Sequence, residues 1–173
     1  RLPADPPRMA RTRARGDRRA IWSAESPAAA FAAPGASNSR SAMPDSATGY
    51  RPTPGVRSFA VQFDHIVSTN LDVAAIALRG LKAAPALGDS AKYLHDKAAL
   101  RQYADTTYGY LLAALRQASP AQLKKPVAMY GQPPQPAARL AQLTFEHSVW
   151  TLGQLVPYLR LNGVTPPEYK MPF

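Results

Sequence analysis

The 173-residue sequence contains no cysteine. Disulfide bonds, thiolate metal ligands and a cysteine nucleophile are therefore excluded. No apolar run approaches the roughly 18–20 residues that a membrane-spanning helix needs, and the sequence has neither a glycine-rich phosphate loop nor a serine nucleophile elbow. We therefore expect a cytoplasmic protein with no membrane span, and we do not expect the common nucleotide-binding or serine-hydrolase chemistries.

Acidic residues are few, and the formal net charge is +10. Residues 1–41 contain eight Lys and Arg against three Asp and Glu, so about half of the excess lies in less than a quarter of the chain. A basic arm of this kind can bind nucleic acid or anionic lipid. The rest of the chain, however, has no basic stripe with interleaved aromatic residues, so nucleic-acid binding is not expected and a solvated tail is favoured.

The composition divides the chain near Met43. Residues 1–42 are rich in Arg, Ala, Ser and Pro, and their prolines would interrupt a helix before it could bury a face. We expect this part to be a basic, disordered N-terminal extension. Residues 43–173 show helical apolar periodicity and are expected to form one helical domain, because the chain is long enough for a single core.

Two helices are predicted in the first part of this domain. The first covers about residues 54–82, with Thr53 as its N-cap and Pro54 at its first position. The second covers about residues 96–118, with Asp96 as its cap, and a short capped turn follows at residues 119–123.

A third helix is predicted from Pro136 to about residue 162, where Gly163 ends it. The stretch 124–136, with four prolines, is expected to be a loop, and no segment has the pattern of a strand. The fold class is therefore all-α, most simply a helix bundle.

His65 and His147 each lie on a predicted amphipathic helix, on the side that should be buried. Residue 151 is one turn beyond His147 and shares its face. Two side chains at this spacing are a common way to place metal ligands side by side. The second position is Thr151, a neutral oxygen donor that is a poor ligand for zinc or nickel.

Four segments in sequence order resemble the DinB-like family of helical-bundle proteins, which includes metal-dependent thiol S-transferases. The segments are Tyr50–Phe59, Phe63–Asn70, Ser119–Leu123 and His147–Gly163. The resemblance implies that residues 43–173 form a DinB-like four-helix bundle whose first helix is poorly formed or missing, and that the protein is bacterial. It further implies a divalent ion, zinc or nickel, bound by three histidines. His65 and His147 match two of them, and Thr151 replaces the third.

Other side chains extend the candidate site. Gln154 and Tyr158 continue the polar face of the last helix, and Trp150 is a candidate for lining a pocket. His95 is the remaining histidine that could complete a ligand set if its loop folds inward. Tyr103, Tyr108 and Tyr110 could donate hydrogen bonds to a substrate, although ordinary core packing explains such residues more often.

Two functional hypotheses remain open from the sequence. The first is a metal-dependent enzyme with a degenerate site, a transferase or hydrolase, that acts on a small-molecule substrate, with a thiol cosubstrate of unknown identity. The second is a non-catalytic helical bundle that has lost the metal and serves as a binding or dimerisation module, for example as a homodimer. Thr151 and the disrupted first helix motivate the second hypothesis.

Overall fold

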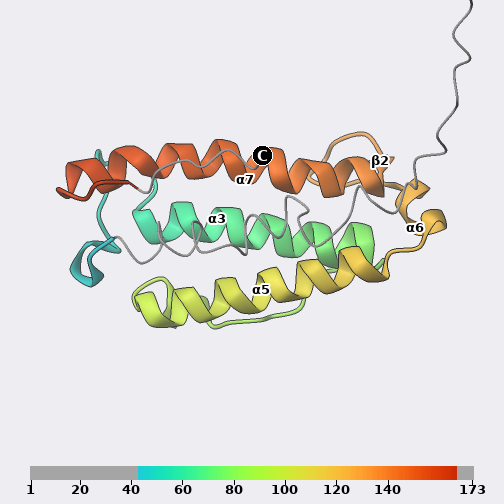
Figure 1. Cartoon of the computed structure of the whole chain (residues 1–173), viewed down its shortest axis with the longest axis horizontal. Coiled ribbons are helices and arrows are strands. Elements are labelled where there is room, and N and C mark those ends of the chain that lie inside the picture. The colour runs from blue at the N-terminus through green and yellow to red at the C-terminus, as the bar shows by residue number, and fades with distance from the viewer. Residues whose placement is uncertain (1–42, 167–173) are drawn as a thin grey trace, which may run out of the picture.

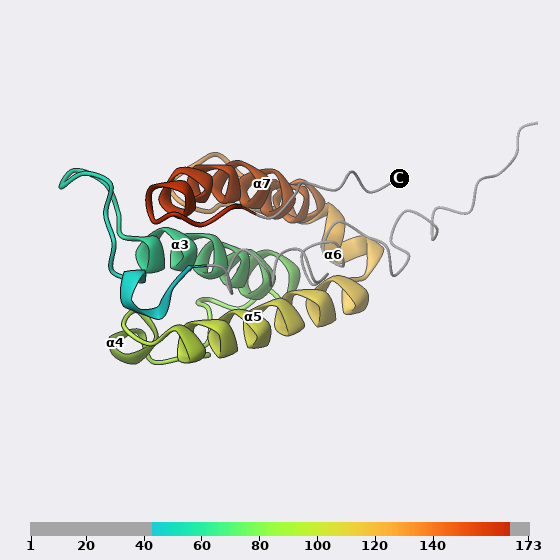
Figure 2. The same ribbon diagram turned by 60° about the vertical axis from the view of Figure 1, so that its left-hand side comes forward.

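Three long helical segments form the centre of the protein. The computed structural model describes residues 43–166. The predictions for residues 1–42, an extension and a poorly formed or missing first helix, lie outside the described residues. Helix α3 (Phe59–Asp72) continues into the π-helical segment η3 (Val73–Leu78), and the other two are α5 (Lys97–Gln117) and α7 (Ala137–Leu161). Figures 1 and 2 show α3 between α5 and α7, with α7 running opposite to α3. The described part is all-α, as predicted.

Short elements connect these helices. They are the 3-10 turn η2 (Asp45–Ala47), helix α4 (Ser90–Tyr93), helix α6 (Pro120–Lys124) and the strands β1 (Pro126–Val127) and β2 (Gln135–Pro136). The two strands pair antiparallel, so the prediction of no strand was wrong for this loop. Each strand has two residues, one of them a proline that has no N–H to donate, and such a short pair leaves almost no pattern in the sequence.

Helix α3 begins five residues later than predicted, so the assignment of Thr53 and Pro54 to its start was wrong. Ser58 is the N-cap, and its hydroxyl accepts from the backbone N–H of Val61 at 3.4 Å. The N–H groups of Phe59 and Ala60 donate to carbonyl oxygens of the preceding loop at 3.0 and 2.9 Å. These contacts satisfy N–H groups that a helix cannot satisfy internally, and they therefore fix where it starts.

The boundaries of the other helices follow the predicted caps. The carboxylate of Asp96 accepts from Ala99 N–H at 3.0 Å at the start of α5. Ser119 caps α6, with Pro120 at its first position. Gly163 follows α7 with a φ of +71°, a left-handed conformation that glycine adopts without steric cost.

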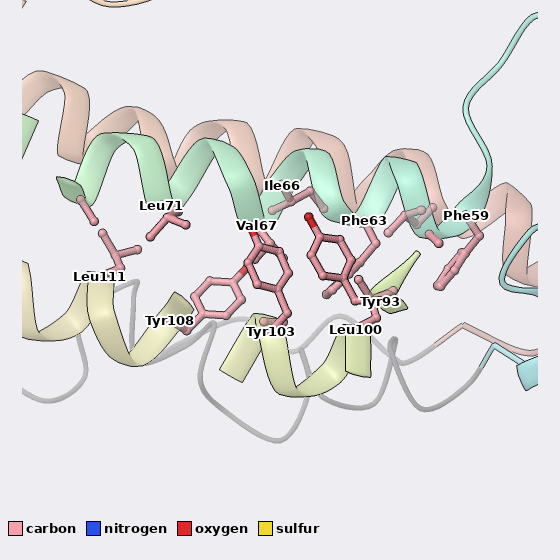
Figure 3. Packing of buried hydrophobic residues seen from close by; sticks show 14 of the residues in the cluster. Phe59, Phe63, Ile66, Val67, Leu71, Tyr93, Leu100, Tyr103, Tyr108 and Leu111 are labelled. Atoms are coloured by element: carbon pink, nitrogen blue, oxygen red, sulfur yellow. The ribbon is translucent and has the colours of Figure 1, made fainter. Parts of the chain in front are cut away.

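The side of α3 that faces α5 is apolar and forms the main core. Figure 3 shows Phe59, Phe63, Ile66, Val67 and Leu71 of α3 close to side chains of α4 and α5, namely Tyr93, Leu100, Tyr103, Tyr108 and Leu111. The rings of Tyr93 and Tyr103 stack in parallel with centroids 4.3 Å apart. A smaller cluster at the η3 end joins Val73 and Ala77 to residues of the β1–β2 loop and of α7. Among the described helices, none is long and apolar enough to cross a membrane.

Candidate metal centre

His65 of α3 and His147 of α7 meet between the two helices. Their Nε2 atoms are 3.2 Å apart, and their rings are nearly perpendicular, with an interplanar angle of 85°. Both side chains are half-buried. The helical spacing predicted that each faces inward, and the antiparallel packing of α7 on α3 brings the two nitrogens together.

The spacing of these nitrogens fits two ligands of one metal ion. Two imidazole nitrogens that bind zinc at 2.0–2.1 Å with a tetrahedral angle between them lie about 3.3 Å apart. The observed 3.2 Å between the Nε2 atoms is close to this value. The same distance also suits a hydrogen bond between two neutral imidazoles, in which one ring donates and the other accepts. The donor set therefore supplies two of the three histidines that the family resemblance implies.

The surroundings favour the neutral form of both rings. Burial lowers the pKa of His65 below 6.5, and the nearby guanidinium of Arg57 lowers it further. Burial also lowers the pKa of His147, with added contributions from His65 and Arg57. A neutral imidazole keeps a lone pair available for a metal ion or for a proton, so the lowered pKa values favour the form that coordination requires.

The second ring nitrogen of His147 has no hydrogen-bond partner among the described residues. Its Nδ1 is buried, and within residues 43–166 no hydrogen bond reaches it. Metal-binding histidines usually donate from this nitrogen to a carboxylate, a carbonyl or a water molecule, which fixes the tautomer. The pair thus has a spacing that would suit two metal ligands, without the hydrogen bond that usually supports such a ligand.

Thr151 stands where the family resemblance implies the third ligand, and its side chain is 2% exposed. No cluster of three His, Cys, Asp or Glu side chains suited to holding an ion occurs within the described residues. His95 is exposed in the turn before α5. The acidic neighbours of the two histidines are engaged elsewhere: Asp64 accepts from the hydroxyl of Tyr93 at 3.0 Å, and Glu146 is bound by Arg139 at 2.8 Å.

Polar contacts on both sides of the histidine pair join the same two helices. The amide of Gln62 donates to Gln154 Oε1 at 2.7 Å, and the buried amide of Asn70 donates to Ser148 Oγ at 3.1 Å. We refer to these two contacts and the histidine pair together as the polar seam. The sequence analysis identified Gln154 but missed Gln62, Asn70 and Ser148. Gln62 could have been found, because it lies three residues before His65 and therefore on the same face of α3.

The remaining predicted site residues lie at different depths. Tyr158 is buried, and its hydroxyl donates to the backbone carbonyl of Arg57 at 2.8 Å. Trp150 is 71% exposed on the outer side of α7, and its role as a pocket residue stays a prediction. Tyr103 and Tyr108 belong to the core, and the ring of Tyr110 lies 4.0 Å from the guanidinium carbon of Arg79.

Comparison with known proteins establishes the family. Residues 39–155 match the model of the DinB superfamily, and the chain belongs to this superfamily. A solved structure of a DinB-like protein from Bacillus subtilis is similar, with a TM-score of 0.62 and 19% sequence identity over 78% of this chain and 89% of that one. At this identity the likeness shows the fold alone. No curated protein matches the chain.

Proposed function

We propose that His65 and His147 bind a divalent ion, zinc or nickel, and that the protein is a metal-dependent enzyme related to the thiol S-transferases. The observation that supports this proposal is the 3.2 Å separation of the two Nε2 atoms. Two half-buried side chains from different helices converge on one point, and burial keeps both in the neutral form that coordination needs.

The residues of the chain have separate parts in this function. A divalent ion, when bound, would lower the pKa of a thiol or water and so generate a nucleophile. His65 and His147 would hold it, and the Gln62–Gln154 contact keeps α3 and α7 at the spacing that joins the two rings. The hydroxyl of Thr151 is a neutral oxygen, so coordination sites remain for water and for a small-molecule substrate.

Metal stoichiometry tests the proposal directly. Protein purified without an affinity tag is loaded with zinc or nickel, dialysed and analysed by mass spectrometry for bound metal. We expect close to one ion per chain in the wild type and in His95→Gln, and a large loss in His147→Gln. Less than about a tenth of an ion per wild-type chain would exclude a metal-dependent enzyme.

A second candidate function is a bundle that keeps the interhelical site without the ion and serves as a binding or dimerisation module. Thr151 at the third ligand position favours it, because two imidazoles hold an ion weakly. The substitution Thr151→His should then create metal binding where the wild type has none. Equal metal affinity in the wild type and the variant would contradict this candidate.

A further inference from the structure

A hydrogen-bonded chain of three side chains starts beside the histidine pair. Arg57 Nη1 donates to Gln62 Oε1 at 3.3 Å, and Gln62 Nε2 donates to Gln154 Oε1 at 2.7 Å. Gln62 lies one turn before His65 on α3, and Gln154 lies two turns after His147 on α7. The chain therefore crosses from one helix to the other at the end of the polar seam nearest the start of α3.

The chemistry of arginine fixes the direction of this chain. A guanidinium has only donors, so Gln62 must turn its oxygen towards Arg57 and its amide nitrogen towards Gln154. Gln154 must then accept with its own oxygen, so its amide N–H groups are not used in this contact. Arg57 and Gln154 are both exposed, whereas Gln62 is buried. Both ends of the chain thus present N–H donors to the solvent next to the two imidazoles.

No described carboxylate neutralises this end of the seam. The ion pairs within residues 43–166 involve Lys97, Arg101 and Arg139, and Arg57 is in none of them. Asp64 faces Tyr93 on the α5 side of α3, and Glu146 is bound by Arg139 and Gln142. The backbone of Arg57 is held against α7 by the hydroxyl of Tyr158.

The hydrogen bond from Arg57 Nη1 to Gln62 Oε1 places the guanidinium beside a side chain that lies one helical turn before His65 on α3. The positive charge of this guanidinium also contributes to the lowered pKa of both His65 and His147. A guanidinium that is held by Gln62, has donors to spare and has no carboxylate partner among the described residues is suited to a planar oxyanion, which it binds through two parallel N–H···O bonds.

We propose that Arg57 and Gln154 bind the carboxylate of a small-molecule ligand and place that ligand next to His65 and His147. This inference rests on the proposed function, because it takes the histidine pair as the functional centre. It adds the chemical class of the ligand: an acidic small molecule whose carboxylate lies at the Arg57 end of the seam.

Titration of the full-length protein with succinate tests the inference, with the neutral isostere succinamide as the control ligand. Binding is followed by calorimetry and by the NMR signals of the histidine rings, in metal-free protein and in protein loaded with zinc. We expect saturable binding of succinate, no binding of succinamide and shifts of both ring signals. Equal binding of the two ligands, or no binding of succinate, would overturn the inference.

Variants locate the site. Arg57→Gln should weaken succinate binding at least about tenfold, and Arg57→Lys, which keeps the charge and loses the planar fork, should fall between it and the wild type. Arg116→Gln removes an exposed charge from the last turn of α5 and should bind as the wild type does. Wild-type affinity in both Arg57 variants would overturn the inference.

The two proposals fail separately. Arg57→Gln removes no proposed metal ligand, so its metal content should equal that of the wild type. Succinate binding that depends on Arg57 in a protein that takes up no metal would reject the metal-dependent enzyme and support the carboxylate site. One ion per chain without binding of succinate would support the metal centre and reject the carboxylate site.

Discussion

Helix α3 packs against two surfaces of different character. Towards α5 it presents Phe63 and Val67, and aromatic and aliphatic side chains of α4 and α5 cover them (Figure 3). Towards α7 it presents the polar seam, whose histidine and amide groups find specific partners. Apolar burial does not depend on direction, whereas hydrogen bonds depend on both distance and angle. One helix thus combines an apolar, stabilising face with a polar face that carries the proposed metal site.

The apolar face should give the largest effect on stability. Phe63 is 2% exposed, and Phe63→Ala should lower the free energy of unfolding by about 3–5 kcal/mol, because it removes buried apolar area and leaves a cavity. Denaturant unfolding measures this change. Val149 of α7 is 41% exposed, and Val149→Ala should cost within about 0.5 kcal/mol. Similar losses in both variants would remove the distinction between the core and the outer surface.

The buried contact of the polar seam, between Asn70 and Ser148, should give the second-largest effect on stability. Ser148→Ala would leave the amide of Asn70 buried without its partner and should cost about 1–3 kcal/mol of unfolding free energy. The double variant Ser148→Ala with Asn70→Leu removes both polar groups and should recover much of that loss. Denaturant unfolding of the single and the double variant tests this, and a double variant no more stable than Ser148→Ala would argue against it.

Acidification should lower the free energy of unfolding that the histidine pair contributes. The pKa values of His65 and His147 are lowered in the folded protein, so the unfolded chain binds more protons once the pH falls below about 6.5. The stability contributed by the neutral rings is therefore present above that pH and decreases below it. In metal-free protein, His147→Gln should reduce the change in unfolding free energy between about pH 7.5 and 5.5 by roughly half.

The control for this measurement is His95→Gln, at an exposed position outside the pair. The raised pKa of the half-buried Asp64 carboxyl opposes the histidine effect at lower pH, and it is common to all of these variants. Equal pH dependence in the wild type and His147→Gln would show that the neutral rings contribute nothing to folding.

The surface ion pair should give the smallest effect. Arg139 and Glu146 contact each other at 2.8 Å on the exposed side of α7, and solvent screens their attraction. Glu146→Gln should leave the unfolding midpoint unchanged within error, even though the lowered pKa of Glu146 reports the contact. A shift as large as that of Ser148→Ala would show that exposure is a poor guide to the strength of polar contacts in this protein.

Local signals predicted much of the fold. Asp96, Ser119 and Gly163 act through atoms within a few residues of themselves, so their positions could be read along the chain. The start of α3 could not be predicted in this way. It depends on hydrogen bonds from the first residues of the helix to the carbonyl groups of Thr48 and Tyr50, in the preceding loop. The π-helical geometry of η3 also had no local signal, since its residues are ordinary helix and core residues.

The candidate site also has a part that the sequence predicted and a part that depends on how the helices pack. Helical periodicity predicted that His65 and His147 face inward. Their 3.2 Å contact depends on how α7 packs along α3, which one sequence does not specify. The Gln62–Gln154 pair joins residues 92 positions apart, and such a pairing becomes visible only when the two helices are placed side by side.

The pairing of α3 with α7 constrains how this chain can change in length. Each helical residue turns the chain by about 100°, so one residue inserted within either helix would rotate every polar group beyond it away from its counterpart. Loops such as 79–89, between η3 and α4, carry none of these pairings and tolerate extra residues at small entropic cost. Insertions and deletions among related proteins should therefore occur between the helices. The segments from Gln62 to Asn70 and from His147 to Gln154 should keep a constant number of residues.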